Sequence, residues 1–180
     1  MRCRISTSTS RRGVLARPTA VDTGLIEGGE VRNVEMPFFE LSYSYVEHAT
    51  FVDCHFHDAV FFKSFLTDCT FRDCRIGRFR SFELGVKGCR FENVNFERYD
   101  IEELSAWGSS FDEVAFVSGR VGPNAFFGCA FAGLRVEDVD VTGRAGYALF
   151  PVRPDEETCV TLERLGVNIE VGDRESRDHL

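Results

Sequence analysis

Several residue types are scarce in this 180-residue chain, and each scarcity excludes a class of protein. The chain has one tryptophan, two methionines and five prolines, and no apolar run approaches the roughly 18 residues that a membrane-spanning helix needs. We therefore expect no membrane contact. The formal net charge of -8 has the wrong sign for direct nucleic-acid binding, which requires a basic surface. Phenylalanine is abundant instead, with 18 copies.

Acidic residues are absent from the first 20 positions, which contain five arginines and the run STSTS. This composition predicts a basic flexible arm over residues 1–18. Three explanations stay open: an organelle transit peptide, a flexible tail, or a start codon assigned too far upstream. No apolar segment of a secretory signal follows Met1. Without export the seven cysteines would stay reduced, so we expect a cytoplasmic protein.

A five-residue repeat dominates the chain from Val21 to Val141. Of the 25 positions in this register, 24 are apolar, Ser81 is the exception, and ten are phenylalanine. A period of five is neither the 3.6 of a helix nor the 2.0 of a strand, so no ordinary amphipathic element explains it. The pattern indicates a repeat architecture.

A second register lies two residues earlier and holds mostly small side chains. Positions two apart on extended backbone point to the same side, so both registers are expected to face inward. The large side chains then fill the interior, and the small ones lie where the backbone turns a corner. The small residues are Ser44, Ala49, Cys54, Ala59, Ser64, Cys69, Cys74, Cys89, Ser109 and Cys129.

Blocks such as CHFHD, CTFRD and CRFEN display the unit. The chain resembles the pentapeptide-repeat protein family over residues 19–143, although Asp or Asn before the central residue is found only at Asn95, Asp100 and Asp140. The resemblance implies an all-β fold, a right-handed quadrilateral β-helix with four pentapeptides per coil. Twenty-five units then give about six coils, with residues 20 apart stacked on one another.

Side-chain volumes support this stacking. Phe79 and Tyr99 are too large for the small register and are 20 residues apart, as are Leu84 and Leu104. Ser81 and Ala106 are the two small residues of the five-residue register, and each lies two positions after one of these large residues. The sequence therefore predicts that the larger side chain fills the volume that its smaller neighbour leaves in the core. Phe150 lies outside the register, so we expect its truncation to cost less than truncation of a central phenylalanine.

The repeat ends after Val141, and residues 144–171 are expected to form a short C-terminal cap. Asp155 is a candidate N-cap, Gly166 a stop signal, and Cys159, Leu162 and Leu165 would share one helix face. The alternating apolar residues Val167, Ile169 and Val171 predict a strand. The cap either closes the solenoid alone or, as the family resemblance suggests, also joins two protomers into a homodimer. Residues 172–180 are polar and are expected to form a disordered tail.

Catalytic and metal motifs give little signal. Five of the seven cysteines occupy the small inward register, where a buried thiol is inert. His55 and His57 flank inward Phe56 and would face outward together, but two nitrogen ligands do not complete a metal site. We predict no enzyme, no metal and no cofactor.

Outward positions of a solenoid should be polar, yet seven are aromatic. They are predicted to form an exposed strip along two adjacent faces, on either side of the corner through Ser44 and Ser64, unless the arm or the cap covers them. Aromatic side chains are the usual anchors of protein interfaces. The predicted partner-binding residues are Tyr43, Tyr45, Phe62, Phe65, Phe82, Trp107 and Phe127.

The sequence therefore predicts a non-enzymatic β-solenoid that acts as a protein-interaction scaffold, with a partner of unknown identity. The alternative comes from the family resemblance, since some members are DNA mimics that bind type II topoisomerases. A mimic needs acids spaced like phosphates. The densest acidic group, Asp100, Glu102 and Glu103, is interrupted by bases at Lys63, Arg80 and Arg120.

Overall fold

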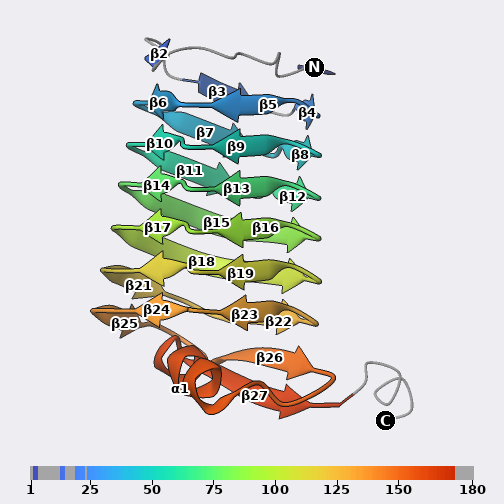
Figure 1. The fold of residues 1–180 in the computed structure, drawn as a ribbon, viewed down its shortest axis with the longest axis vertical. Coiled ribbons are helices and arrows are strands. Elements are labelled where there is room, and N and C mark those ends of the chain that lie inside the picture. Colours follow the sequence, from blue (N-terminus) through green and yellow to red (C-terminus); the bar gives the residue numbers. More distant parts are fainter. Residues whose placement is uncertain (1, 4–12, 15–18, 23, 173–180) are drawn as a thin grey trace.

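Short parallel strands stack into a rod of about seven turns, with a short helix near the C-terminal end (Figure 1). The computed structural model describes residues 2–3, 13–14, 19–22 and 24–172, with side chains from residue 24 onward. Each regular strand pairs with strands 20 residues earlier and later, for example Phe51 with Phe71 and Phe71 with Phe91. The predicted all-β solenoid with a C-terminal cap is confirmed.

Each complete coil has one side on each of four faces, which we number in chain order. Face 1 holds β3 (Thr19–Asp22), β7 (Phe39–Ser42), β11 (Ala59–Phe62), the first halves of β15 (Phe79–Lys87) and β18 (Tyr99–Trp107), β21 (Gly119–Val121) and β25 (Val139–Val141). Face 2 holds β1 (Arg2–Cys3), β4 (Leu25–Glu27), β8 (Tyr45–Glu47), β12 (Phe65–Thr67), the second halves of β15 and β18, β22 (Asn124–Phe127), β26 (Gly146–Phe150) and β27 (Val167–Val171). Because β15 and β18 run through the corner, these two faces form one 14-stranded sheet.

The other two faces are separate sheets. Face 3 holds β5 (Glu30–Arg32), β9 (Thr50–Val52), β13 (Thr70–Arg72), β16 (Arg90–Glu92), β19 (Ser110–Asp112) and β23 (Ala130–Ala132). Face 4 holds β2 (Gly13–Val14), β6 (Val34–Met36), β10 (His55–Phe56), β14 (Arg75–Ile76), β17 (Asn95–Phe96), β20 (Ala115–Phe116) and β24 (Arg135–Val136). Face 4 has seven strands where about six coils were predicted, because β2 adds backbone before the first regular repeat.

The five-residue register forms the core. From Ile26 to Val136 every central side chain is buried except Phe131, which is partly buried. On face 3 the phenylalanines stack in one column, with ring centroids 4.9 Å apart for Phe51–Phe71, 5.2 Å for Phe71–Phe91 and 5.1 Å for Phe91–Phe111. At the C-terminal end of the register Val141 is exposed, since β25 is the last strand of its face.

The predicted volume compensation is present. Phe79 lies in register with Tyr99, and Ser81 with Ile101, so the large and small inward residues alternate within one coil. The structure adds a feature that the sequence did not reveal: the backbone carbonyl of Tyr99, together with the base of its ring, occupies the space that a side chain at Gly119 would need. The Tyr99 hydroxyl is buried without a hydrogen-bond partner among the described residues, and its burial raises the pKa of Tyr99 to about 12.

Three of the four corners use a residue in the left-handed backbone region. Twelve non-glycine residues have φ between 47 and 57°, among them Tyr43, Lys63 and Asp138. Each such residue costs on the order of 1 kcal/mol of backbone strain. At the corner between faces 4 and 1, Asp138 is the one described residue with a left-handed backbone, and the earlier coils turn there without such a residue. The four corners are therefore not equivalent.

The cap forms as predicted. Helix α1 (Glu156–Arg164) begins after Asp155, whose carboxylate accepts a hydrogen bond from the Thr158 backbone N–H at 2.8 Å. Cys159, Leu162 and Leu165 are all buried. The additional strand β26 was not predicted, because two extra residues shift its register: Ala125 pairs with Tyr147 rather than with residue 145.

Two short strands lie within the segment predicted to be a flexible arm. The backbone of Arg2–Cys3 pairs with Leu25–Ile26, and Gly13–Val14 pairs with Val34–Glu35. These pairings satisfy backbone groups at the open first coil. The remainder of the arm, and residues 173–180 of the predicted tail, lie outside the described residues.

The expectation for Phe150 is revised, because its side chain is 4% exposed and packs on Phe131 with ring centroids 6.0 Å apart. We now expect Phe71→Ala, Phe91→Ala and Phe150→Ala each to lower the free energy of unfolding by about 3–5 kcal/mol, since each removes a buried ring. Denaturant unfolding measures this. Val152→Ala is the control, since Val152 is 76% exposed. A Phe150 variant as stable as that control would contradict the packing described here.

Candidate functional site

Five of the seven predicted aromatic residues meet at the corner between faces 1 and 2. We call them the aromatic corner: Tyr43, Tyr45, Phe62, Phe65 and Phe82. At the turn after β7, Tyr43 contacts Phe62 of face 1 edge-on at 5.3 Å between ring centroids, and Phe62 stacks on Phe82 at 5.3 Å. On face 2, Tyr45 stacks on Phe65 at 5.4 Å with the rings 10° from parallel.

The aromatic corner is accessible on the described surface. Tyr43 is 52% exposed, Tyr45 51% and Phe65 43%, while Phe62 and Phe82 are half-buried by their stacking. The Phe65 ring lies over Gly85, in the space that a larger residue there would occupy. No described part of the cap covers these rings, so the described residues form an apolar surface that is open to solvent.

Buried serines hold the backbone beneath the aromatic corner. The Ser44 hydroxyl donates to the Ser42 carbonyl at 2.8 Å and accepts from the Gly24 N–H at 3.2 Å. The Ser64 hydroxyl lies 2.9 Å from the Phe62 carbonyl and 3.0 Å from the Leu41 carbonyl. A small hydroxyl at this turn therefore ties neighbouring coils together and fixes the direction of the outward rings.

Trp107 and Phe127 are not part of the aromatic corner. They stack at 5.8 Å on the opposite edge of face 2, and Tyr147 meets Phe127 edge-on at 5.1 Å. We call these three residues the aromatic shelf. The sequence missed Tyr147 because it follows the break in the repeat. The seven predicted residues thus form two separate surfaces rather than one strip.

Lys63, which the sequence identified only as a base that interrupts the acidic group, lies at the aromatic corner. The Lys63 ammonium lies 5.9 Å from the centroid of Phe62 and 5.6 Å from that of Phe82, and 3.2 Å from the Glu83 carboxylate. This arrangement combines a cation–π contact with an ion pair. The signal was available, since Lys63 precedes Glu83 by one 20-residue coil.

Carboxylates border the aromatic corner. Glu102 lies in register below Phe82, and Glu103 follows it at the turn. Glu47 lies two residues beyond Tyr45 on the same strand and therefore on the same side. Within the part of the chain that the structure describes, these three acids form no ion pair.

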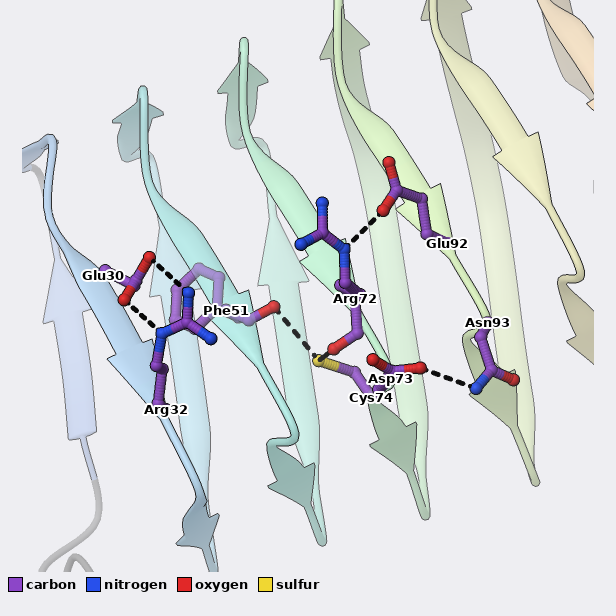
Figure 2. Close-up of polar contacts among 8 residues, drawn as sticks. All are labelled: Glu30, Arg32, Phe51, Arg72, Asp73, Cys74, Glu92 and Asn93. Atoms are coloured by element: carbon purple, nitrogen blue, oxygen red, sulfur yellow. Dashed lines mark hydrogen bonds and ion pairs between the residues drawn. The ribbon is translucent and has the colours of Figure 1, made fainter. Parts of the chain in front are cut away.

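Elsewhere acids and bases alternate between coils. Figure 2 shows Arg72 bonded to Glu92 at 2.6 Å on the next coil, and Asp73 accepting from Asn93 at 2.8 Å. Asp100, from the acidic group noted in the sequence, pairs with Arg120, and Arg78 and Arg80 both pair with Asp58. The acidic faces are therefore locally neutralised rather than continuous.

The inward cysteines form columns. Six described cysteines are buried and unbonded to each other by disulfides. The Cys74 thiol donates to the carbonyls of Phe51 and Arg72 (Figure 2). Its hydrogen bond with Cys54 and its burial raise the pKa of the Cys74 thiol, and the contact with Cys69 together with burial does the same for Cys89. Such thiols have little thiolate at neutral pH and act as small core residues.

Thiol labelling checks this role. In a Cys3→Ser variant, we expect the six buried thiols to stay unmodified by an aqueous thiol reagent at pH 8 until the protein is unfolded in guanidinium, because burial keeps the reagent from the sulfur atoms. Mass spectrometry counts the modified sites. Modification of Cys69 or Cys74 in the folded protein would show that the columns are open to solvent.

The two outward histidines meet as expected, with ring centroids 4.0 Å apart. Burial, followed by the charges of His57 and Arg75, lowers the pKa of His55. His57 lies 3.9 Å from the Glu35 carboxylate. Among the residues that the structure describes, no three His, Cys, Asp or Glu side chains are grouped so as to hold a metal ion. The same residues include no helix long and apolar enough to cross a bilayer.

A family model supports the repeat over part of the chain. A family model for pentapeptide repeats matches residues 40–77 with eight copies. The full-length structure of QnrB1, described as a plasmid-mediated fluoroquinolone resistance protein, aligns over 96% of this chain and 87% of its own, with 13% identity and a TM-score of 0.44. A trypsin-treated QnrB1 variant aligns over 85% of this chain and 98% of its own, with 15% identity and a TM-score of 0.28. No curated protein sequence matches the chain.

Proposed function

Since this chain belongs to the pentapeptide-repeat family, we propose that it is a non-enzymatic scaffold that binds a protein partner through its aromatic corner. The observation that carries the proposal is a series of outward rings in contact, with Tyr43 at the turn against Phe62 and Phe62 stacked on Phe82, beside the Tyr45–Phe65 pair. Contiguous exposed aromatic surface marks interaction sites, whereas scattered single rings do not. Aromatic side chains are enriched among the residues that dominate binding energy.

The rigidity of the site favours binding over catalysis. Both sides of the aromatic corner lie on paired strands of one 14-stranded sheet, so little conformational freedom would be lost when a partner docks. We also propose that the protein is cytoplasmic. The support is that its cysteines serve as small inward residues, a role suited to a reducing compartment.

The DNA-mimic alternative has weaker support. A mimic must present carboxylates in an uninterrupted row, at about one charge per 1.7 Å of duplex axis. Here Arg120 pairs with Asp100, Arg72 with Glu92 and Arg75 with Glu97. Bases on neighbouring coils thus interrupt the acidic rows, which favours the scaffold.

Substitution at the aromatic corner tests the scaffold. We expect the double variant Phe62→Ser and Phe82→Ser to keep the far-UV spectrum of the parent, because both side chains point outward, and to lose most of its partner in quantitative affinity capture from the native host. The matched control is Arg72→Ser with Glu92→Ser, an outward pair on face 3. Capture by the aromatic variant at the level of this control would rule out the proposed surface.

We further propose that the C-terminal segment joins two copies of the chain. The strand β27 is the last of its sheet among the described residues, and Val171 on it is 53% exposed. An edge strand with an exposed apolar residue favours pairing with another chain.

Sedimentation velocity tests this dimer. We expect the parent protein to sediment as a dimer and Val171→Asp to sediment as a monomer, because a charge would be buried at the contact. Thr70→Asp, on face 3, should leave the dimer intact. A monomeric parent at micromolar concentration would contradict the dimer proposal without affecting the aromatic corner.

A further inference from the structure

We infer that the partner segment recognised by the aromatic corner is extended and rich in arginine. The inference rests on the proposed scaffold function and specifies the chemistry of its partner. Three observations support it. A lysine of the chain already lies over two rings of the aromatic corner, other exposed rings of the corner have no described cation over them, and carboxylates lie along its border.

Lys63 shows how this surface binds a cation. Its ammonium lies within 6 Å of the Phe62 and Phe82 centroids and 3.2 Å from the Glu83 carboxylate. The rings contribute the negative face of their π systems, and the carboxylate contributes the opposite charge. An intramolecular cation therefore occupies one binding position of the aromatic corner.

The other exposed rings of the aromatic corner have no cation of the described residues over them. No described lysine or arginine lies over the rings of Tyr43, Tyr45 or Phe65, which are also the most exposed members of the corner. One carboxylate, that of Glu47, lies on the same strand and the same side as the open ring of Tyr45, and two more, those of Glu102 and Glu103, border Phe82 one coil further along. The surface is thus complementary to positive charge presented on a flat group.

Arginine fits this surface better than lysine does. Its guanidinium is planar, weakly hydrated, and able to stack on an aromatic ring while its edge bonds a carboxylate. The Tyr45 and Phe65 rings are nearly parallel, at 10°, and offer flat ring surface. An extended partner segment places alternate side chains on one side, so that successive arginines could reach successive rings along the corner. Nucleic acid is excluded as the occupant, because its phosphates would be repelled by the same carboxylates.

Peptide binding to the full-length protein tests the inference. The probes are fluorescein-labelled octapeptides of alternating arginine and serine, with matched peptides carrying lysine or the neutral isostere citrulline in place of arginine. We expect saturable anisotropy binding with arginine, weaker binding with lysine, and none with citrulline. Tyr45→Ser with Phe65→Ser should weaken arginine-peptide binding about tenfold, because two stacking rings are removed.

Charge-matched variants separate specific recognition from general attraction. Glu47→Gln with Glu102→Gln should weaken binding about threefold. The control is Asp112→Asn with Glu113→Gln, which changes the net charge by the same amount at face 3 and the turn after it, and it should leave binding unchanged. Lys63→Gln should strengthen binding, because it frees the Phe62 and Phe82 rings. Lys87→Gln changes net charge by the same amount and should have a smaller effect, since Lys87 lies over no ring within the described structure.

Several outcomes would overturn the inference: equal binding of arginine and citrulline peptides, unchanged binding by the Tyr45/Phe65 variant, or equal weakening by both glutamate variants. So would self-association that the Tyr45/Phe65 variant abolishes while no peptide binds, since a second copy would then occupy the corner. If that variant does not fold, the three peptides still decide the matter on the parent protein. Loss of partner capture by the Phe62/Phe82 variant without arginine-peptide binding would leave the scaffold function standing and reject only the arginine chemistry.

Discussion

The hydrogen bonds between neighbouring coils are the constraint on which the rest of this structure depends. Within Thr19–Val141 the ladders join residues 20 positions apart. The corner bonds repeat with the same period: the Tyr43 N–H donates to the Phe62 carbonyl, and 20 residues later the Lys63 N–H donates to the Phe82 carbonyl. Parallel ladders satisfy the backbone of both flanking coils. Because the period is fixed, each side chain stands directly over its counterpart one coil away, and the molecule becomes a set of columns.

The stacking of residues 20 positions apart arranges both the inward and the outward side chains in columns. Inside, phenylalanines stack on face 3, while cysteines and serines stack at the corners, where the Cys89 N–H donates to the Ser109 hydroxyl at 3.1 Å. Outside, bases stand over acids, as Arg72 stands over Glu92. The left-handed corner residues carry strain at many positions, and the repeated ladders and filled interior offset it. Where the backbone of one coil comes close to the next, as at the Tyr99 carbonyl, the residue one coil away is glycine, Gly119.

Most outward positions of the rod carry polar or charged side chains, so outward aromatic rings in contact with one another are unusual, and the stability of the fold does not require them. An exposed ring gains less from burial than the inward phenylalanines, yet Phe62 and Phe82 stack on face 1 and Tyr43 meets Phe62 from the turn. Lys63 and Glu83 then add charge to the same surface. Rings, an already bound cation and unpaired carboxylates together describe a surface suited to a cationic partner, held on strands that do not need to rearrange for binding.

The sequence by itself determined the architecture, because the five-residue period is visible wherever a large apolar residue follows a small one, as in the pair Cys69 and Phe71. It also determined the helix after Asp155, through a local cap and stop signal. Tertiary structure alone decided that Trp107 and Phe127 stand apart from the aromatic corner and join Tyr147, since the two-residue shift before β26 sets that contact. It likewise decided that Phe150 is buried and that Lys63 lies over two rings. The physical reason is that periodicity specifies which side of the backbone a residue occupies, whereas the contacts of an outward or out-of-phase side chain depend on rotamers and neighbouring coils.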